Sequence, residues 1–230
     1  VPEIVTLTAV PSGGTPGYTY LWSTGETTSS IDVMPQSTTT YSVTITDSKG
    51  CTATDDATVT VWDMPEVTAT NDEICAGESA TISASVSGGT PPYSYLWSNG
   101  ATTTSITVSP AGTTSYSVTV PDANGCSHGA VGTVTVNPNP TVSVADQAVC
   151  EQIEVPEIVT LTAVPSGGTP AYTFLWSTGE TTASIDVMPQ ATTSYSVTIT
   201  DSEGCTAMED ATVTVWDMPE VSASNEEICA

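Results

Sequence analysis

Residues Ser87–Trp97 read Ser-Gly-Gly-Thr-Pro-Pro-Tyr-Ser-Tyr-Leu-Trp, and near copies of this phrase occur at Ser12–Trp22 and Ser166–Trp176. The phrase joins a glycine- and proline-rich turn to a segment in which aromatic residues alternate with others. Alternation with a period of two places successive side chains on opposite faces of a β-strand, so the aromatic residues share one face. The phrase therefore predicts a turn followed by a strand whose aromatic face is buried.

The phrase recurs because the whole chain is repetitive. The tryptophans that end the three copies of the phrase are 75 and then 79 residues apart (positions 22, 97 and 176), and each repeat contains a turn of the form Asp-x-x-Gly-Cys. Residues 1–76 and 155–230 differ at only eleven of 76 positions, so the duplicated unit is a pair of repeats. Self-similarity at a fixed period is typical of a tandem array. We predict three domains, residues 1–75, 76–154 and 155–230.

The composition of each repeat indicates an all-β fold. Thr, Ser and Val dominate, and Gly and Pro recur at short intervals, as in strands joined by turns. Six or seven short strands per repeat, with the tryptophan in the third, are typical of an immunoglobulin-like sandwich. We therefore predict tandem immunoglobulin-like sandwiches that form an extended rod. The expected core aromatic residues are Trp22, Trp97, Trp176, Tyr41, Tyr116 and Tyr195.

Cysteines occur twice in each repeat, which predicts disulfides formed in an oxidising compartment. The six are Cys51, Cys75, Cys126, Cys150, Cys205 and Cys229. One scheme joins them in sequence order, 51–75, 126–150 and 205–229, around a turn at Asp-Met-Pro or Pro-Asn-Pro in which Val59 faces Val67. We favour that scheme. An ordinary immunoglobulin topology instead makes residues 67–70 the first strand of the next repeat. It would allow bridges within a repeat (75–126 and 150–205) or between neighbours (75–205).

The charge of the chain limits its partners. Asp and Glu number 26 against a single basic residue, Lys49, which gives a formal net charge of −25. Such a surface repels nucleic acid and anionic membranes. No stretch approaches the roughly 18 apolar residues of a membrane span. Since the sequence shows no export signal, we expect the chain to be an internal piece of a longer secreted protein.

Sites for chemistry are scarce in this sequence. His128 is the only histidine, and there is no arginine, phosphate-binding loop or histidine-bearing metal motif. Adjacent acids such as Asp55 and Asp56 point to opposite faces of a strand and do not converge on a substrate. We therefore predict that the chain is not an enzyme and has no bound cofactor.

Calcium is the one ion that the acidic residues could bind, because Ca²⁺ prefers oxygen ligands. The candidates are Asp47, Asp55, Asp56, Asp72 and Glu73. No Asp-x-Asp-x-Asp loop occurs, and the middle repeat has few of these acids. A solvated acidic surface is the favoured interpretation, with calcium as the alternative.

Several phrases together resemble known surface repeats. The segments Ser87–Thr103, Tyr116–Val120 and Asp122–Cys126 are similar to repeats of large Bacteroidota cell-surface proteins, among them gliding-motility adhesins of the SprB type and PKD-like arrays. The resemblance implies an extracellular cell-surface location and transfers no catalytic residue. It favours a structural segment of a long fibre, stalk or filament that supports adhesion or gliding. Its partners would be neighbouring repeats or identical chains. The alternative is an adhesin module that binds a glycan or a protein.

Overall fold

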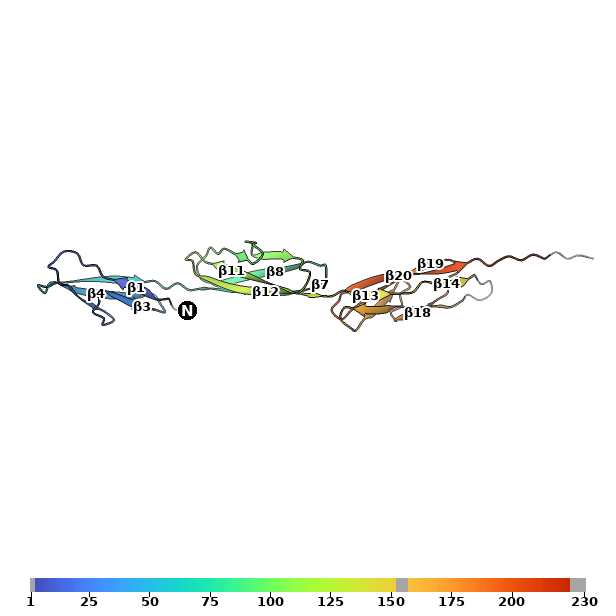
Figure 1. Ribbon diagram of the computed structural model, residues 1–230, viewed down its shortest axis with the longest axis horizontal. Coiled ribbons are helices and arrows are strands. Elements are labelled where there is room, and N and C mark those ends of the chain that lie inside the picture. Colours follow the sequence, from blue (N-terminus) through green and yellow to red (C-terminus); the bar gives the residue numbers. More distant parts are fainter. Residues whose placement is uncertain (1–2, 152–156, 224–230) are drawn as a thin grey trace, which may run out of the picture. The chain divides into compact units, whose positions relative to one another are not determined.

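The computed structural model describes residues 3–151 and 157–223, and every regular element in these residues is a β-strand (Figure 1). No helix in this described part of the chain could cross a membrane. Contacts group the chain into two units. The first unit comprises residues 1–68, 84–104 and 117–130, and the second comprises residues 69–83, 105–116 and 131–230.

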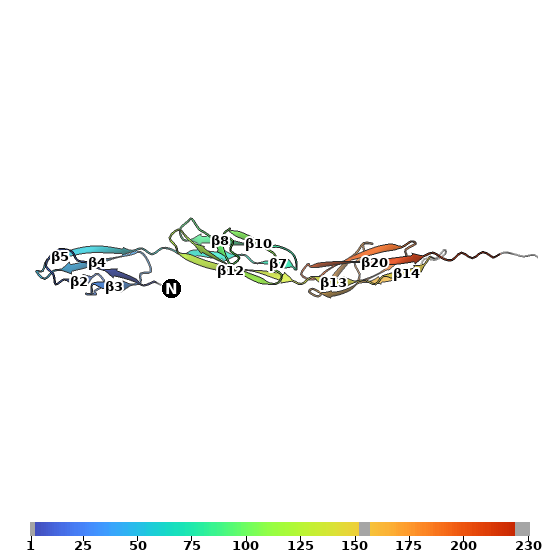
Figure 2. The ribbon, with the colours of Figure 1, turned by 45° about the horizontal axis from the view of Figure 1, so that its top comes forward.

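The first repeat forms two small antiparallel sheets (Figure 2). One sheet pairs β1 (Val5–Thr8) with β3 (Ser30–Val33). The other has the order β2-β4-β5, with β2 at Thr19–Trp22, β4 at Thr39–Thr46 and β5 at Thr52–Val59. Its core contains Trp22, Ile31, Val33, Tyr41 and Val43, contributed by both sheets. The aromatic strand of the quoted phrase is therefore β2, with Trp22 buried.

The second repeat has sheets of order β10-β8-β6 and β7-β12-β11-β9. Its strands are β6 (Pro65–Ala69), β7 (Asp72–Cys75), β8 (Ala80–Gly88), β9 (Leu96–Trp97), β10 (Ser105–Val108), β11 (Thr114–Pro121) and β12 (Ser127–Asn137). Strand β7 runs parallel to β12, and the other registered pairs are antiparallel. The first two strands of this repeat therefore join different sheets, β6 the three-stranded sheet and β7 the four-stranded one.

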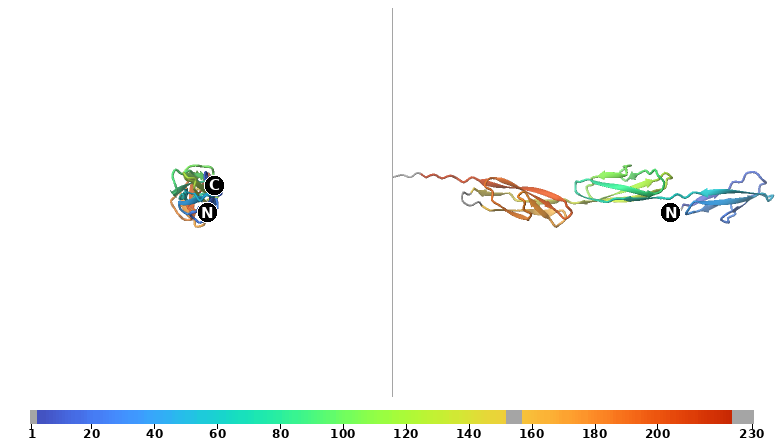
Figure 3. Two further views of the ribbon diagram at one scale, coloured as in Figure 1. Left: turned by 90° about the vertical axis from the view of Figure 1, so that its left-hand side faces the viewer. Right: turned by 180° about the vertical axis from the view of Figure 1, so that it is seen from behind.

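The third repeat follows the same plan and is seen from behind, in yellow to red, in Figure 3. Its strands are β13 (Pro140–Ser143), β14 (Gln147–Cys150), β15 (Val159–Thr162), β16 (Val164–Gly167), β17 (Thr173–Trp176), β18 (Ser184–Val187), β19 (Thr193–Thr200) and β20 (Thr206–Trp216). The largest sheet has the order β14-β20-β19-β17, and β14 runs parallel to β20. Smaller pairs, β13 with β16 and β15 with β18, complete the repeat.

Strands β6 and β7 are the leading strands of the second repeat, and they place its start earlier than the sequence predicted. Strands β6 and β7, residues 65–75, belong to sheets built from residues 80–137, so the predicted boundary at 75/76 falls after two strands that pair with the following repeat. Thr70 and Asn71 lie between them. The Thr70 hydroxyl accepts the N–H of Ser83, and the Asn71 side-chain oxygen accepts the N–H of Thr133. The predicted boundary at 154/155 lies outside the described residues.

Burial of the predicted core aromatics falls into two classes. The three tryptophans are at most 3% exposed, and each indole Nε1 donates to a backbone oxygen, of Thr28, Thr103 or Thr182. Tyr41 is also buried, whereas Tyr116 and Tyr195 are partly buried. A buried indole N–H needs a partner, and the constant distance of six residues to its acceptor supplies one in every repeat.

Candidate functional site

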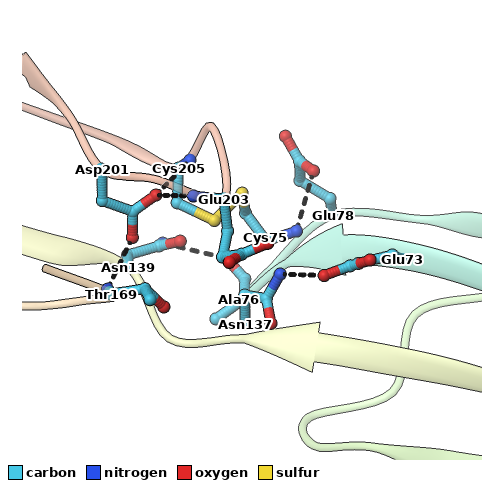
Figure 4. Close-up of a disulfide and its surroundings, with 10 residues drawn as sticks. All are labelled: Glu73, Cys75, Ala76, Glu78, Asn137, Asn139, Thr169, Asp201, Glu203 and Cys205. Carbon is cyan, nitrogen blue, oxygen red and sulfur yellow. Dashed lines mark hydrogen bonds between the residues drawn. A yellow bond between two sulfur atoms is a disulfide. The ribbon is translucent and has the colours of Figure 1, made fainter. Parts of the chain in front are cut away.

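A disulfide joins the second repeat to the third. It links Cys75, the last residue of β7, to Cys205 in the turn that precedes β20, and the two residues are 130 positions apart in sequence (Figure 4). Both cysteines lie in the second contact unit. This bond closes a covalent loop that contains most of both repeats, so we take it and its surroundings as the candidate functional site.

The Asp-x-x-Gly-Cys turn holds Cys205 in place. One oxygen of Asp201, Oδ1, accepts the N–H of Cys205 at 2.8 Å and that of Glu203 at 3.0 Å, while Oδ2 accepts the N–H of Thr169 at 2.9 Å. Gly168 has φ +61°, and a Cβ there would lie 2.7 Å from the Asp201 carboxylate. The Ser-Gly-Gly-Thr-Pro phrase therefore needs its second glycine to let the carboxylate reach the following N–H.

The other two repeats build the same turn. Asp122 accepts N–H groups from Cys126 at 2.9 Å and from Thr90 at 2.9 Å. Asp47 does so from Cys51 at 2.9 Å and from Thr15 at 3.0 Å. Each repeat thus holds a cysteine in the same hydrogen-bonded turn. The turn is fixed by its Asp, which also accepts the N–H of the Thr in the Ser-Gly-Gly-Thr-Pro phrase.

Polar contacts surround the Cys75 side of the bridge, as Figure 4 shows. The N–H of Cys75 donates to the Glu78 carboxylate at 3.1 Å. Asn139 donates through Nδ2 to the backbone oxygen of Ala76 at 3.0 Å, and Asn137 donates to Glu73 at 2.7 Å. Sequence reasoning missed both asparagines. The available signal was that Asn-Pro-Asn-Pro replaces Trp-Asp-Met-Pro at this one junction.

The favoured sequence-order disulfide scheme is wrong for Cys75 and Cys205. Its basis was a hairpin in which Val59 faces Val67. In the structure Val59 pairs with Thr39 of β4, and Val67 lies in β6 of the next repeat. The chain therefore continues forward through residues 60–64 and carries Cys75 to the far end of the second repeat. The between-neighbour alternative is the pairing found.

Three other cysteines are unpaired among the described residues. Cys51 and Cys150 are exposed, and Cys126 is partly buried. The predicted bridges 51–75 and 126–150 are accordingly not formed. Cys229 lies outside the described residues, and its proposed partner Cys205 is bonded to Cys75.

Four of the five calcium candidates accept hydrogen bonds from the backbone or from a neighbouring side chain. Asp47 caps its own turn, Asp72 accepts the N–H groups of Glu73 and Thr81, and Glu73 accepts from Asn137. Asp55 accepts the N–H of Asp56. In residues 3–151 and 157–223 no group of three or more His, Cys, Asp or Glu side chains is arranged to hold a metal ion. Calcium binding stays a prediction.

His128 has a structural contact. Its Nδ1 accepts the N–H of Val67 at 3.3 Å, which attaches β12 to the leading strand β6. Ala53 and Ala207 occupy this position in the other repeats. The histidine therefore takes part in strand packing within the middle repeat.

The stability that the Asp201 turn contributes depends on pH. Hydrogen bonds from the backbone, above all from Thr169 and then from Cys205, Glu203 and Gly204, hold the pKa of Asp201 below its usual 3.8, although burial opposes them. The pKa of Asp47 is lowered in the same way, chiefly by Thr15. Because folding lowers the pKa, this stabilisation is complete above the unfolded pKa and is lost as the pH falls through the folded one.

We expect Asp201→Asn to lower the thermal midpoint at pH 7, because an amide cannot accept on both of its polar atoms. The difference from the parent should shrink as the pH falls from the usual carboxyl pKa of 3.8 toward the lower pKa of folded Asp201, because protonation of the parent carboxylate removes the charged acceptor. Thermal melts of both chains from pH 7 to pH 2 measure it. A difference that is constant over this range would contradict the charged-acceptor account.

Comparisons with known proteins agree with this architecture. The structure resembles the titin I-band fragment I67–I69, with a TM-score of 0.50 and 11% identity over 94% of this chain and 93% of that one. An E-to-A variant of the same titin domains gives the same values. Three N-terminal domains of the bacteriophage RB49 Hoc protein match at a TM-score of 0.43 and 14% identity, covering 93% and 94% of the two chains. No curated protein matches the sequence.

The sheets and the titin likeness define the class as a tandem array of immunoglobulin-like sandwiches, as predicted. The SprB repeat family model matches this chain at residues 6–27, 67–102 and 160–181. These matches, one in each repeat, confirm the resemblance to SprB-type repeats drawn from the motifs of the chain. The middle match begins within β6, in agreement with the strand pairing that assigns β6 to the second repeat.

Proposed function

We propose that this chain is a structural segment of an extracellular fibre, stalk or filament at a cell surface, where it supports adhesion or gliding. The observation that carries the proposal is the Cys75–Cys205 disulfide. Its cysteines lie near the start of the second repeat and near the end of the third. A pulling force that enters through β6 and β7 can therefore pass through the bond to β20. The intervening residues are then shielded from extension.

Three further features support this role. SprB repeats belong to cell-surface proteins, and a disulfide suits an extracellular location. The same turn and core recur in all three repeats, as expected of a scaffold in which no single repeat is specialised. The exposed strand faces carry paired hydroxyls, such as Thr44 with Thr54 and Thr81 with Thr107. We infer that the chain is not an enzyme.

Small-angle scattering tests the extended arrangement that a fibre requires. The longest strands have 11 residues, which corresponds to roughly 36 Å at about 3.3 Å per residue. Three repeats placed end to end should therefore give a maximum dimension on the order of 100 Å. The scattering curve of a compact globule would contradict the fibre.

The alternative is a binding module, and one observation favours it. In the first repeat a cavity of about 290 Å³ lies between the loop at Pro11–Gly14 and the Asp47 turn. A glycan array probed with the chain tests this alternative, and strong selective binding would support a receptor over a scaffold.

Calcium could stabilise the repeats whether the chain is a structural segment or a binding module. Because four of the five acidic candidates already accept hydrogen bonds from the backbone or from Asn137, we expect EDTA to leave the thermal midpoint unchanged. A lowered midpoint that added calcium restores would assign a metal role to these residues.

A further inference from the structure

The one histidine of the chain, His128, stands where the other two repeats have an alanine on the inner face of a sheet. Ala53 pairs with Ile45 in the first repeat, and Ala207 pairs with Ile199 in the third. Residues that pair directly across two strands share one face of the sheet, and Ile199 is fully buried. The imidazole of His128 is therefore directed toward the opposite sheet of its sandwich.

This imidazole connects the two sheets of the second repeat. Its Nδ1 accepts the N–H of Val67 at 3.3 Å. His128 belongs to β12 of the four-stranded sheet, whereas Val67 belongs to β6, an edge strand of the three-stranded sheet. The bond therefore holds the two sheets together at one edge of the sandwich. An alanine side chain has no acceptor, so the first and third repeats cannot form this bond.

The N–H of Val67 faces the open side of β6. Thr70, which follows β6, donates its N–H to the backbone oxygen of Ser83 in β8 at 3.0 Å. Because the N–H groups of successive residues point to opposite sides of a strand, the N–H of Val67, three residues earlier, points away from β8. Val67 is 5% exposed, and a buried donor that loses its acceptor is costly. His128 supplies that acceptor.

A proton on His128 removes the acceptor. Neutral imidazole has one nitrogen that accepts and one N–H that donates, whereas both nitrogens of the imidazolium are donors. The bond from Val67 therefore requires a neutral ring with its proton on Nε2. Histidine changes its charge between about pH 5 and pH 8, so the bond forms at the upper end of this range and is lost at the lower end.

Acidic groups on the surrounding elements are directed elsewhere or already used. Glu66 is exposed on β6 and lies on the opposite face of the strand from the buried Val67. Asp122, in the turn before β12, accepts three backbone N–H groups. The imidazolium therefore gains no carboxylate that would hold β6 in place of the lost bond. The other titratable residues on these elements are Asp63, Asp72, Glu73, Tyr116 and Cys126.

We propose that protonation of His128 releases the leading strand β6 from β12, so that the start of the second repeat responds to pH. At neutral pH the bond holds β6, and residues 60–64 connect it to β5 of the first repeat. Below about pH 6 the edge strand opens more often, and the connection then extends into residues 65–69. This response is independent of the structural role proposed above.

Amide hydrogen exchange of Val67, followed by NMR on the whole chain at pH 7.5 and pH 5.0, tests the proposal. Protection factors correct for the intrinsic pH dependence of exchange and report how often an amide opens. We expect the protection factor of Val67 to fall at least five-fold at the lower pH. The amide of Trp176, which donates to Glu180 in the third repeat, should keep its protection. Unchanged protection of Val67 would overturn the proposal.

His128→Ala is the matched control, because alanine occupies this position in the other two repeats. In this variant the Val67 amide should be weakly protected at both pH values, with no difference between them. An equal fall in the variant and the parent would assign the effect to other groups and contradict the proposal. Nitrogen chemical shifts of the imidazole give a second readout. At pH 7.5 the ring proton should be on Nε2, and a proton on Nδ1 would rule out the bond.

Discussion

Replacing Cys75 and Cys205 together with alanine should lower the free energy of unfolding of the second and third repeats by about 2–5 kcal/mol. The bond closes a loop of 130 residues. The loop-entropy estimate for this length is about 5 kcal/mol, and measured bridges more often give about 2–4. Denaturant unfolding of the variant and the parent, without reductant, measures the difference.

The matched control replaces the three unpaired cysteines, Cys51, Cys126 and Cys150, with alanine and keeps the bridge. None of them is bonded in the structure, so this variant should lie within about 0.5–1 kcal/mol of the parent. Equal effects of the two variants would show that the Cys75–Cys205 bond does not stabilise the repeats.

Trp176→Ala should destabilise the third repeat by about 3–5 kcal/mol, the usual cost of removing a large aromatic residue from a core. Trp176 is 2% exposed and packs between the two faces of its repeat. Its Nε1 donates to the backbone oxygen of Thr182 at 2.9 Å, and the substitution leaves that oxygen without its partner. Chemical denaturation followed by circular dichroism gives the free energy.

Trp216→Ala is the control within the same repeat. Trp216 is 60% exposed, and its pairing with Cys150 in the sheet is made by the backbone. We expect a change of less than about 1 kcal/mol. Similar losses for the two tryptophans would contradict the assignment of Trp176 as the centre of the core.

Much of the fold could be predicted because its signals are local. The alternation that places Trp97 on the buried face, and the turn glycines that precede it, depend on residues that are neighbours in sequence. The Asp-x-x-Gly-Cys turn is equally local, since Asp122 accepts N–H groups from residues two and four positions later. Period and composition then assigned the immunoglobulin-like class.

The repeat boundary could not be obtained from the period alone. The period of a tandem array is the same wherever the first repeat begins. It therefore does not indicate whether residues 65–75 belong to the first repeat or to the second. Both choices bury alternate valines: Val67 could face Val59 in a hairpin or join the core of the next sandwich. The structure selects the second choice, with Val67 buried in β6.

The disulfide pairing depended on that boundary. Once β6 and β7 lead the second repeat, Cys75 is carried along the length of that sandwich and reaches the turn of the third. The two cysteines are 130 residues apart, so no short-range sequence pattern indicates that they pair. The asparagines of the second junction, which donate to Glu73 and to the backbone of Ala76, were missed for the same reason.

Single-molecule extension of the chain from its two ends, with and without reductant, tests most directly whether the Cys75–Cys205 bond carries load between repeats. With the bond intact, the 130 residues of the loop should stay hidden, and full extension should release only the remaining 100 of 230 residues, about 360 Å at ~3.6 Å per residue. Reductant should add about 470 Å. A total extension that is the same under both conditions would contradict the account.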